Sequence, residues 1–201
     1  FPLSNFIIFP NTTVPLNIFE PTYIQMIDDS MQSHRMIGMI QPKKSGELKK
    51  PDLYEVGCIG KITSFNETDD GRYLVIINGI SRFNINKEIE TNKLYRTCEV
   101  NYEKYNRDLD DNVEKFALKD LDKIFKDLKN LFEKKGFLVD WTSLKKENFS
   151  NTLNTLSMAS PFSLEEKQVL LETKDLNTRK LVLEEILNTY IRDDFSNKTI
   201  Q

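Results

Sequence analysis

The sequence has few of the residues that metal binding and acid–base catalysis use most often. Its 201 residues include one histidine, His34, and two cysteines, Cys58 and Cys98. A histidine-based metal site or a Ser–His–Asp triad therefore has a single available anchor. The two cysteines stand too far apart in the sequence for a metal knuckle. We expect both to act as small buried hydrophobic residues of a protein in a reducing cytosol. We accordingly predict a cytoplasmic protein with no metal and no cofactor.

Long apolar runs and a charge excess of one sign are also missing. The longest uninterrupted aliphatic run, Leu74–Ile77, is far below the ~20 residues that a membrane span needs. Basic residues number 28 and acidic residues 31, divided as 12 and 13 in residues 1–105 and as 16 and 18 in residues 106–201. Neither half is basic, which disfavours a membrane or nucleic-acid partner.

One segment resembles a phosphate-binding loop but departs from it in two ways. Between Gly57 and Gly60 stand two residues rather than four, and Ile62, not serine or threonine, follows Lys61. A strand bent at glycines is the better interpretation. With no other set of titratable residues arranged for catalysis, we predict that the chain is not an enzyme.

What is present is a change of hydrophobic period near residue 105. Before it, residues alternate with period two between short turn signals, and Asp69-Asp70-Gly71 is a strong hairpin signal. Glu20-Pro21 is typical of a helix start. This half is predicted to hold about six strands and one helix. The strand candidates are Phe6–Phe9, Val14–Ile18, Met36–Ile40, Tyr54–Phe65, Tyr73–Ile77 and the alternating stretches from Phe83 to Tyr102.

After residue 105 the period becomes 3.6, which indicates amphipathic helices. Apolar residues recur at three- and four-residue steps from Val113 to Leu131. Ser163 and Glu166 have the spacing of a capping box, and Asp175 is placed to cap a last helix. We therefore predict an α+β protein with a β subdomain over residues 1–105 and a C-terminal helical bundle over residues 106–201.

Several motifs follow one another in order over most of the chain: Pro2-Leu3, Phe9-Pro10 and Pro15–Tyr23, then Val56–Ile62, Asp70–Tyr73 and Gly79–Phe83, and finally Ser163–Gln168, Leu170–Glu172 and Arg179. In this order they resemble the N-terminal domain of the Lon protease family. Three positions depart from the family pattern. Asn11 stands where glycine is frequent, Asn17 where histidine is common and Thr22 where arginine is common.

The resemblance implies a PUA-like β pseudo-barrel with one embedded helix, followed by a helical subdomain. It also implies capture of unfolded or damaged polypeptides for a degradation machine, by a stand-alone copy without the motor and protease domains. A separate ATP-dependent protease as partner, and oligomer formation, are both compatible with this role. The composition, rich in lysine and asparagine, is typical of an AT-rich bacterial genome.

Four methionines are our candidate substrate patch. Met26, Met31, Met36 and Met39 follow one another closely, and Met26 lies off the expected buried stripe of the first helix. A flexible thioether repacks around many side chains, which suits a binder of varied clients. The competing interpretation is that each methionine fills an irregular core.

Glu20 and Arg82 are predicted to form a structural ion pair. Both are charged residues within otherwise apolar segments, where a buried charge needs a partner. Two functional alternatives also stand: an RNA-binding PUA-like module, and an adaptor or scaffold for one specific protein.

Overall fold

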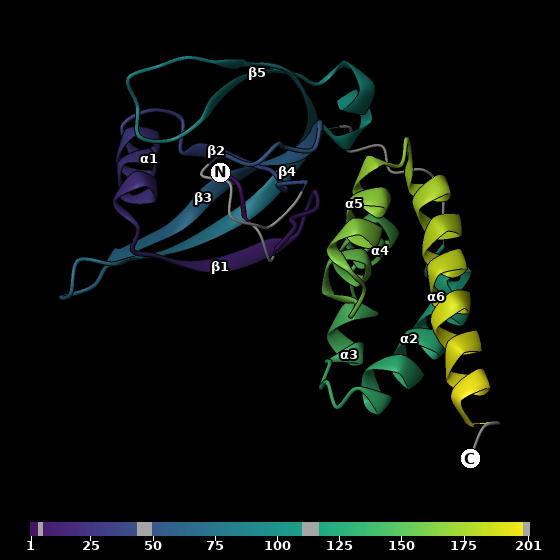
Figure 1. The fold of residues 1–201 in the computed structure, drawn as a ribbon. Coiled ribbons are helices and arrows are strands. Elements are labelled where there is room, and N and C mark those ends of the chain that lie inside the picture. The colour runs from purple at the N-terminus through teal and green to yellow at the C-terminus, as the bar shows by residue number, and fades with distance from the viewer. Residues whose placement is uncertain (4–5, 44–49, 110–116, 199–201) are drawn as a thin grey trace. The chain divides into compact units, whose positions relative to one another are not determined.

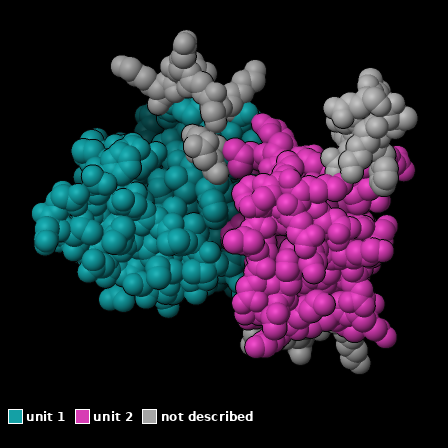
Figure 2. All heavy atoms as spheres, turned by 90° about the horizontal axis from the view of Figure 1, so that it is seen from below, with its two compact units in different colours: residues 1–110 teal, residues 111–201 magenta. Residues whose placement is uncertain are grey.

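The computed structural model describes residues 1–3, 6–43, 50–109 and 117–198, with side chains up to Arg192. The chain forms two compact units, Phe1–Asp110 (unit 1) and Asp111–Gln201 (unit 2), which are coloured separately in Figure 2. This division lies five residues beyond the predicted one. The reason is that the short helix η1 (Glu103–Leu109) packs on strand β4 and buries Tyr105 there.

Unit 1 is built on an antiparallel five-stranded sheet (Figure 1). The strands are β1 (Thr13–Ile18), β2 (Met36–Met39), β3 (Val56–Glu67), β4 (Tyr73–Ile89) and β5 (Thr97–Asn101). Their order is β1-β4-β3-β2, and β5 pairs with β4. The predicted strand Phe6–Phe9 is wrong, because this segment belongs to none of the five strands of the sheet. Tyr73–Ile77 and the segment from Phe83 belong to one strand rather than two.

Strand β4 is long and pairs with two different strands, one after the other, along the same edge. Its first residues, Tyr73–Asn78, pair with β1, and Asn84–Ile89 pair with β5. Gly79 lies between these two stretches and exchanges backbone hydrogen bonds with Asn11 and Thr12. A Cβ atom at Gly79 would lie 2.0 Å from the carbonyl oxygen of Phe9, so only glycine fits this approach.

The predicted hairpin joins β3 to β4. Gly71 has a φ of +77°, and its N–H donates to the carbonyl of Thr68, while the Thr68 N–H donates to the carbonyl of Arg72. Asn11, the residue that stands in place of a turn glycine, has a φ of +58°. Asparagine tolerates this left-handed conformation better than most other residues with a Cβ atom. This explains how the turn forms with asparagine in place of glycine.

Helix α1 (Pro21–Met31) begins at the predicted proline. It packs Ile27, with no exposed surface, against the sheet, and Tyr23, Ile24 and Met31 lie around the same core. Met26 was expected off the buried stripe, and this was wrong, because its side chain is only 5% exposed. The core continues into the sheet through Val14, Ile18, Ile37, Met39, Cys58, Ile62, Val75 and Ile77.

Unit 2 consists of helices. They are η2 (Leu118–Leu121), α2 (Asp122–Lys134), α3 (Trp141–Leu144), α4 (Phe149–Ala159), α5 (Leu164–Glu172) and α6 (Leu176–Lys198). The apolar stripe predicted from Val113 onward is buried in α2 through Ile124, Leu128 and Leu131, and its start at Val113 lies outside the described residues. None of the described helices is long and apolar enough to cross a membrane.

Both predicted helix caps are present. The Ser163 hydroxyl accepts from the N–H of Glu166 (3.2 Å), and the Glu166 carboxylate accepts from the N–H of Ser163 (2.7 Å). The Asp175 carboxylate accepts from the N–H of Thr178 at 2.7 Å. Each cap satisfies backbone donors that have no partner within the helix.

The close approach at Gly79 leads to a stability prediction. We expect Gly79→Ala to lower the free energy of unfolding by about 1–3 kcal/mol, because the new methyl group collides with backbone that cannot move aside alone. The measurement is urea denaturation. Gly71→Ala is the comparison, since a Cβ there meets no atom within 4 Å and costs only the backbone conformation, about 1 kcal/mol. A smaller loss at Gly79 than at Gly71 would contradict the packing argument.

Candidate binding pocket

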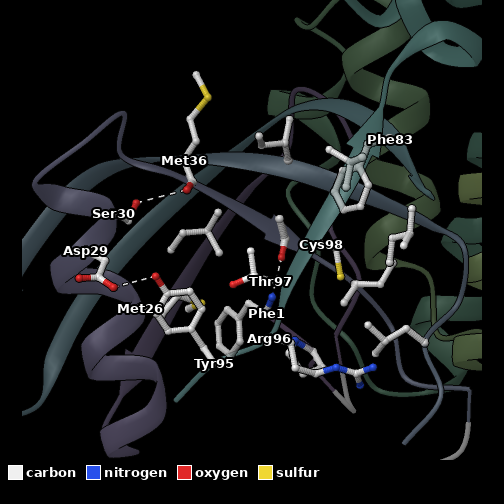
Figure 3. A pocket seen from close by; sticks show the side chains of 18 of the residues that line it. Phe1, Met26, Asp29, Ser30, Met36, Phe83, Tyr95, Arg96, Thr97 and Cys98 are labelled. Carbon is white, nitrogen blue, oxygen red and sulfur yellow. Dashed lines mark hydrogen bonds between the residues drawn. The ribbon is translucent and has the colours of Figure 1, made fainter. Parts of the chain in front are cut away.

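Unit 1 contains a cavity of about 430 Å³, large enough for a small ligand or a few side chains (Figure 3). It lies between α1, the strands β2 to β5 and the chain start. Its lining is mostly apolar or aromatic: Phe1, Pro2, Met26, Met36, Ile37, Gly38, Ile40, Leu53, Ile59, Phe83, Ile85, Tyr95, Val100 and Tyr102, with Asp29, Ser30, Ser33, Arg96, Thr97 and Cys98 as the polar remainder.

The strand pattern explains how three of these residues reach the pocket. Cys98, Val100 and Tyr102 alternate along and just beyond β5, so they share one side of the strand. Val100 stands opposite Ile85 of β4, which also lines the pocket. The β4–β5 pairing therefore supplies one apolar wall.

A segment between β4 and β5, residues 90–96, is tied to α1 by side-chain contacts. The Asp29 carboxylate accepts from the Lys93 ammonium and from the Tyr95 hydroxyl, both at 2.7 Å, and Figure 3 shows Asp29 facing Tyr95. The Gln25 side-chain oxygen accepts from the N–H of Leu94 at 2.9 Å. The bond to Lys93 is the main cause of the lowered pKa of Asp29. Burial, followed by the bond to Asp29, raises the pKa of Tyr95 to about 12. Both groups thus hold the protonation states that this contact needs at neutral pH.

Arg96 is held on the other side of the pocket. Its guanidinium makes two bonds to the Glu88 carboxylate, at 2.9 and 2.8 Å, and one to the carbonyl of Pro51 at 2.7 Å. Lys50 lies 3.0 Å from Glu88. Arg96, with Lys50 in support, lowers the pKa of Glu88 from 4.5 to about 2. The arginine is thus committed to protein partners.

Neither cysteine has the surroundings of a reactive thiol. Cys58 is fully buried, and Cys98 lines the pocket with its pKa raised, chiefly by burial. Among the residues that the structure describes, no group of three or more His, Cys, Asp or Glu side chains is placed to hold a metal ion.

The four predicted methionines divide into two pairs. Met26 and Met36 line the pocket; Met36 is 44% exposed and accepts, through its carbonyl, a bond from the Ser30 hydroxyl. Met39 is buried in the core, and Met31 packs against that core. The structure thus brings only two of the four to the pocket, so the four do not form one surface.

Arg82 has a different partner from the one predicted. Its guanidinium donates two hydrogen bonds to the Asp108 carboxylate, at 2.8 and 2.7 Å, and the backbone N–H of Arg82 donates to the same carboxylate at 2.9 Å. The guanidinium also lies 4.2 Å from the centre of the Tyr105 ring. Glu20 is exposed ahead of α1. The predicted Glu20–Arg82 pair is therefore wrong, because the carboxylate that binds the buried Arg82 is that of Asp108 in η1.

Sequence reasoning missed most of the pocket lining. Asp29, Tyr95 and Arg96 belong to no motif, and their roles depend on the return of residues 90–96 over α1. Two signals were usable: the alternation of Cys98, Val100 and Tyr102, which predicted one shared side of a strand, and the choice of Met26 and Met36 as candidate contact residues.

The fold is that of solved Lon N-terminal domains. A Lon N-terminal domain protein from Xanthomonas campestris superposes with a TM-score of 0.65 at 18% identity, covering 94% of this chain and 95% of that chain. The N-terminal domain of the Mycobacterium avium complex Lon protease gives a TM-score of 0.61 at 18% identity, covering 94% and 96%. At this identity the likeness defines the fold alone.

Sequence comparison assigns the family. The profile of the ATP-dependent protease La (LON) substrate-binding domain matches residues 1–189, and the chain belongs to this family. Lon protease of Malacoplasma penetrans is 32% identical over 198 residues, which cover 90% of this chain and 24% of that protein. Lon protease of Dictyoglomus thermophilum is 24% identical over 189 residues, covering 89% and 22%. The chain thus spans about a quarter of the length of these relatives or less.

The Arg82–Asp108 contact predicts a large loss of stability when one partner is removed. Asp108→Asn removes the negative charge that is bonded to Arg82, which is 3% exposed, and should lower the free energy of unfolding by about 3–5 kcal/mol. Glu20→Gln is the control and should change it by less than about 0.5 kcal/mol. Guanidinium denaturation of both variants measures this. A loss for Asp108→Asn no larger than that for Glu20→Gln would contradict the stabilising role of the Arg82–Asp108 contact.

The Glu88–Arg96 contact predicts a pH-dependent contribution to stability. Because folding lowers the pKa of Glu88, the contact stabilises the folded protein fully above about pH 4.5, and this contribution is lost as the pH falls toward about 2. The stability difference between the parent and Glu88→Gln should therefore be constant near neutrality and shrink in that window. Thermal unfolding of both proteins across pH 2–7 tests it. A difference that grows on acidification would contradict the lowered pKa.

Proposed function

We propose that this chain recognises unfolded or damaged polypeptides without cutting them, and that it does so at the pocket of unit 1. The observation that carries the proposal is the pocket itself, an apolar cavity with Met26 and Met36 in its walls. Such a cavity accepts apolar side chains that a folded client would keep buried. Membership of the substrate-binding domain family supports the same role.

The polar groups of the pocket support tolerance of many sequences. Asp29 is bonded to Lys93 and Tyr95, Arg96 to Glu88 and Pro51, and the Ser30 hydroxyl to a backbone carbonyl. A pocket that discriminates sharply presents polar groups that only the correct ligand satisfies. Here the protein itself satisfies Asp29, Arg96 and Ser30, so what remains for a client is mostly apolar surface together with the hydroxyls of Thr97 and Tyr102. Methionine side chains can reshape that apolar surface.

The proposal extends to the surroundings of this chain. We infer that unit 1 is a PUA-like pseudo-barrel and unit 2 a helical bundle, supported by β5 continuing the sheet from β4 and by the buried helical stripes. The partners are unfolded cytoplasmic polypeptides and an ATP-dependent protease that degrades them, a role supported by the Lon proteases among the relatives. No feature of the pocket favours RNA, since its one arginine is already bound to Glu88.

Removing apolar surface from the pocket should weaken client binding. We expect Met36→Ser to lower the affinity for a reduced, alkylated and permanently unfolded test protein roughly fivefold, because one partly exposed thioether no longer contacts the client. Fluorescence anisotropy at two salt concentrations measures it, with little salt dependence expected.

Leu94→Ser is the matched control for this experiment. Leu94 is 64% exposed but does not line the pocket, so its loss should leave the affinity unchanged. If Met36→Ser and the parent bind the unfolded protein with equal affinity, the pocket is not the binding site. Binding of RNA with a steep salt dependence, in place of the unfolded protein, would favour the alternative module.

A further inference from the structure

A second apolar surface lies on the outer side of the sheet, where β1, β4 and β3 run side by side (Figure 1). We call it the outer sheet face and define it by Pro15 and Asn17 of β1, Leu74 and Ile76 of β4, and Ser64 and Asn66 of β3. All six are exposed, with Leu74 at 43% and Ile76 at 37%. The register places Pro15 and Ser64 on either side of Ile76, and Asn17 and Asn66 on either side of Leu74.

The outer sheet face carries no charge, although 29% of the chain is charged. Its margin is Asn78, whose side-chain oxygen accepts from the Thr13 hydroxyl at 3.0 Å. Charged residues flank the face at both ends: Lys61 stands opposite Asn78 on β3, and Arg72, which is paired with Asp70, precedes Leu74 by two residues. In a sheet with one exposed face, residues along each strand alternate between a buried apolar face and an exposed face of polar or charged residues. Depletion of charge around exposed aliphatic residues is instead typical of the centre of an interface.

We propose that the outer sheet face is a second contact surface for the same clients, and that it takes an extended, uncharged segment of an unfolded polypeptide. This inference rests on the proposed function. Leu74 and Ile76 contact the apolar side chains of the segment, and the flanking asparagine and serine side chains bond to its exposed backbone. A segment with charges at these positions would lose their hydration and gain no counter-charge.

The size of the face favours a short segment over a folded partner. Three strands that each contribute three residues, from Pro15 to Asn17, Leu74 to Ile76 and Ser64 to Asn66, cover roughly 14 Å by 10 Å, or about 140 Å². A stable interface between folded proteins buries about 800 Å² on each side. An extended segment of three residues is about 10 Å long and matches the face along the strands.

Strand β4 connects this face to the pocket. Asn78 stands opposite Lys61, and Phe83, which lines the pocket, stands opposite Gly57. Lys61 and Gly57 are four residues apart on β3 and so lie on the same side of that strand. Ile76 and Phe83 are therefore on one side of the sheet, about 23 Å apart along β4. One unfolded chain can contact both sites when more than about seven extended residues separate its two apolar segments.

The test compares two uncharged synthetic peptides built from Leu, Val, Thr and Asn, one of six residues and one of twenty. The full chain is compared with the double variant Leu74→Thr/Ile76→Thr, in which threonine preserves the strand propensity. We expect the double variant to bind the long peptide about tenfold more weakly than the parent and the short peptide within about twofold. Ile89→Thr is the matched control, since Ile89 is 40% exposed on the same strand outside the face, and it should bind like the parent.

Each other outcome has a defined meaning. If the double variant and the parent bind the long peptide equally, while Met36→Ser binds the unfolded protein more weakly, the outer sheet face is not a client contact and the proposed function stands. Failure of the parent to bind either peptide or an unfolded protein overturns both. Sedimentation of the parent as a dimer that the double variant dissociates identifies the face as a self-association surface and also overturns the inference. Matching urea midpoints of all variants exclude unfolding as the cause.

Discussion

Strand β4 is the constraint on which the rest of unit 1 depends. It pairs with β3 on one edge and, on the other, with β1 and then with β5, so its seventeen residues connect every part of the sheet except β2. The change of partner occurs at Gly79, where the backbone of Phe9 comes too close for any side chain. A single glycine thus permits the arrangement that places β5 over the pocket.

The pocket depends on a second constraint, the tethering of the segment that leads into β5. Asp29 accepts from Lys93 and Tyr95, and Glu88 accepts from Arg96, so the second half of this segment, before β5, is fixed by contacts to carboxylates. These contacts engage both charged side chains of the lining, Asp29 and Arg96, with protein partners. What a ligand meets is therefore mostly apolar surface, which is the physical reason that we propose a sequence-tolerant binder.

The sequence predicted those features whose cause is local. The hairpin at Gly71, the capping box at Ser163 and the start of α1 each depend on a few neighbouring residues, and all are present. The partner of Arg82 and the burial of Met26 were missed, because both depend on which distant segment packs nearby. The family motifs indicated the fold, but the pocket lies largely outside those motifs, because its walls come from segments that are distant in the sequence.

The central claim is that clients bind at the pocket, and the methionine methyl groups report on it directly. The chain has five methionines, so methyl-labelled protein gives five signals. On titration with an unfolded protein, the account predicts that the signals of Met26 and Met36, which line the pocket, shift together. Met158, in α4 of unit 2, should keep its position. A shift confined to Met158, or binding that leaves Met26 and Met36 unmoved, would contradict the account.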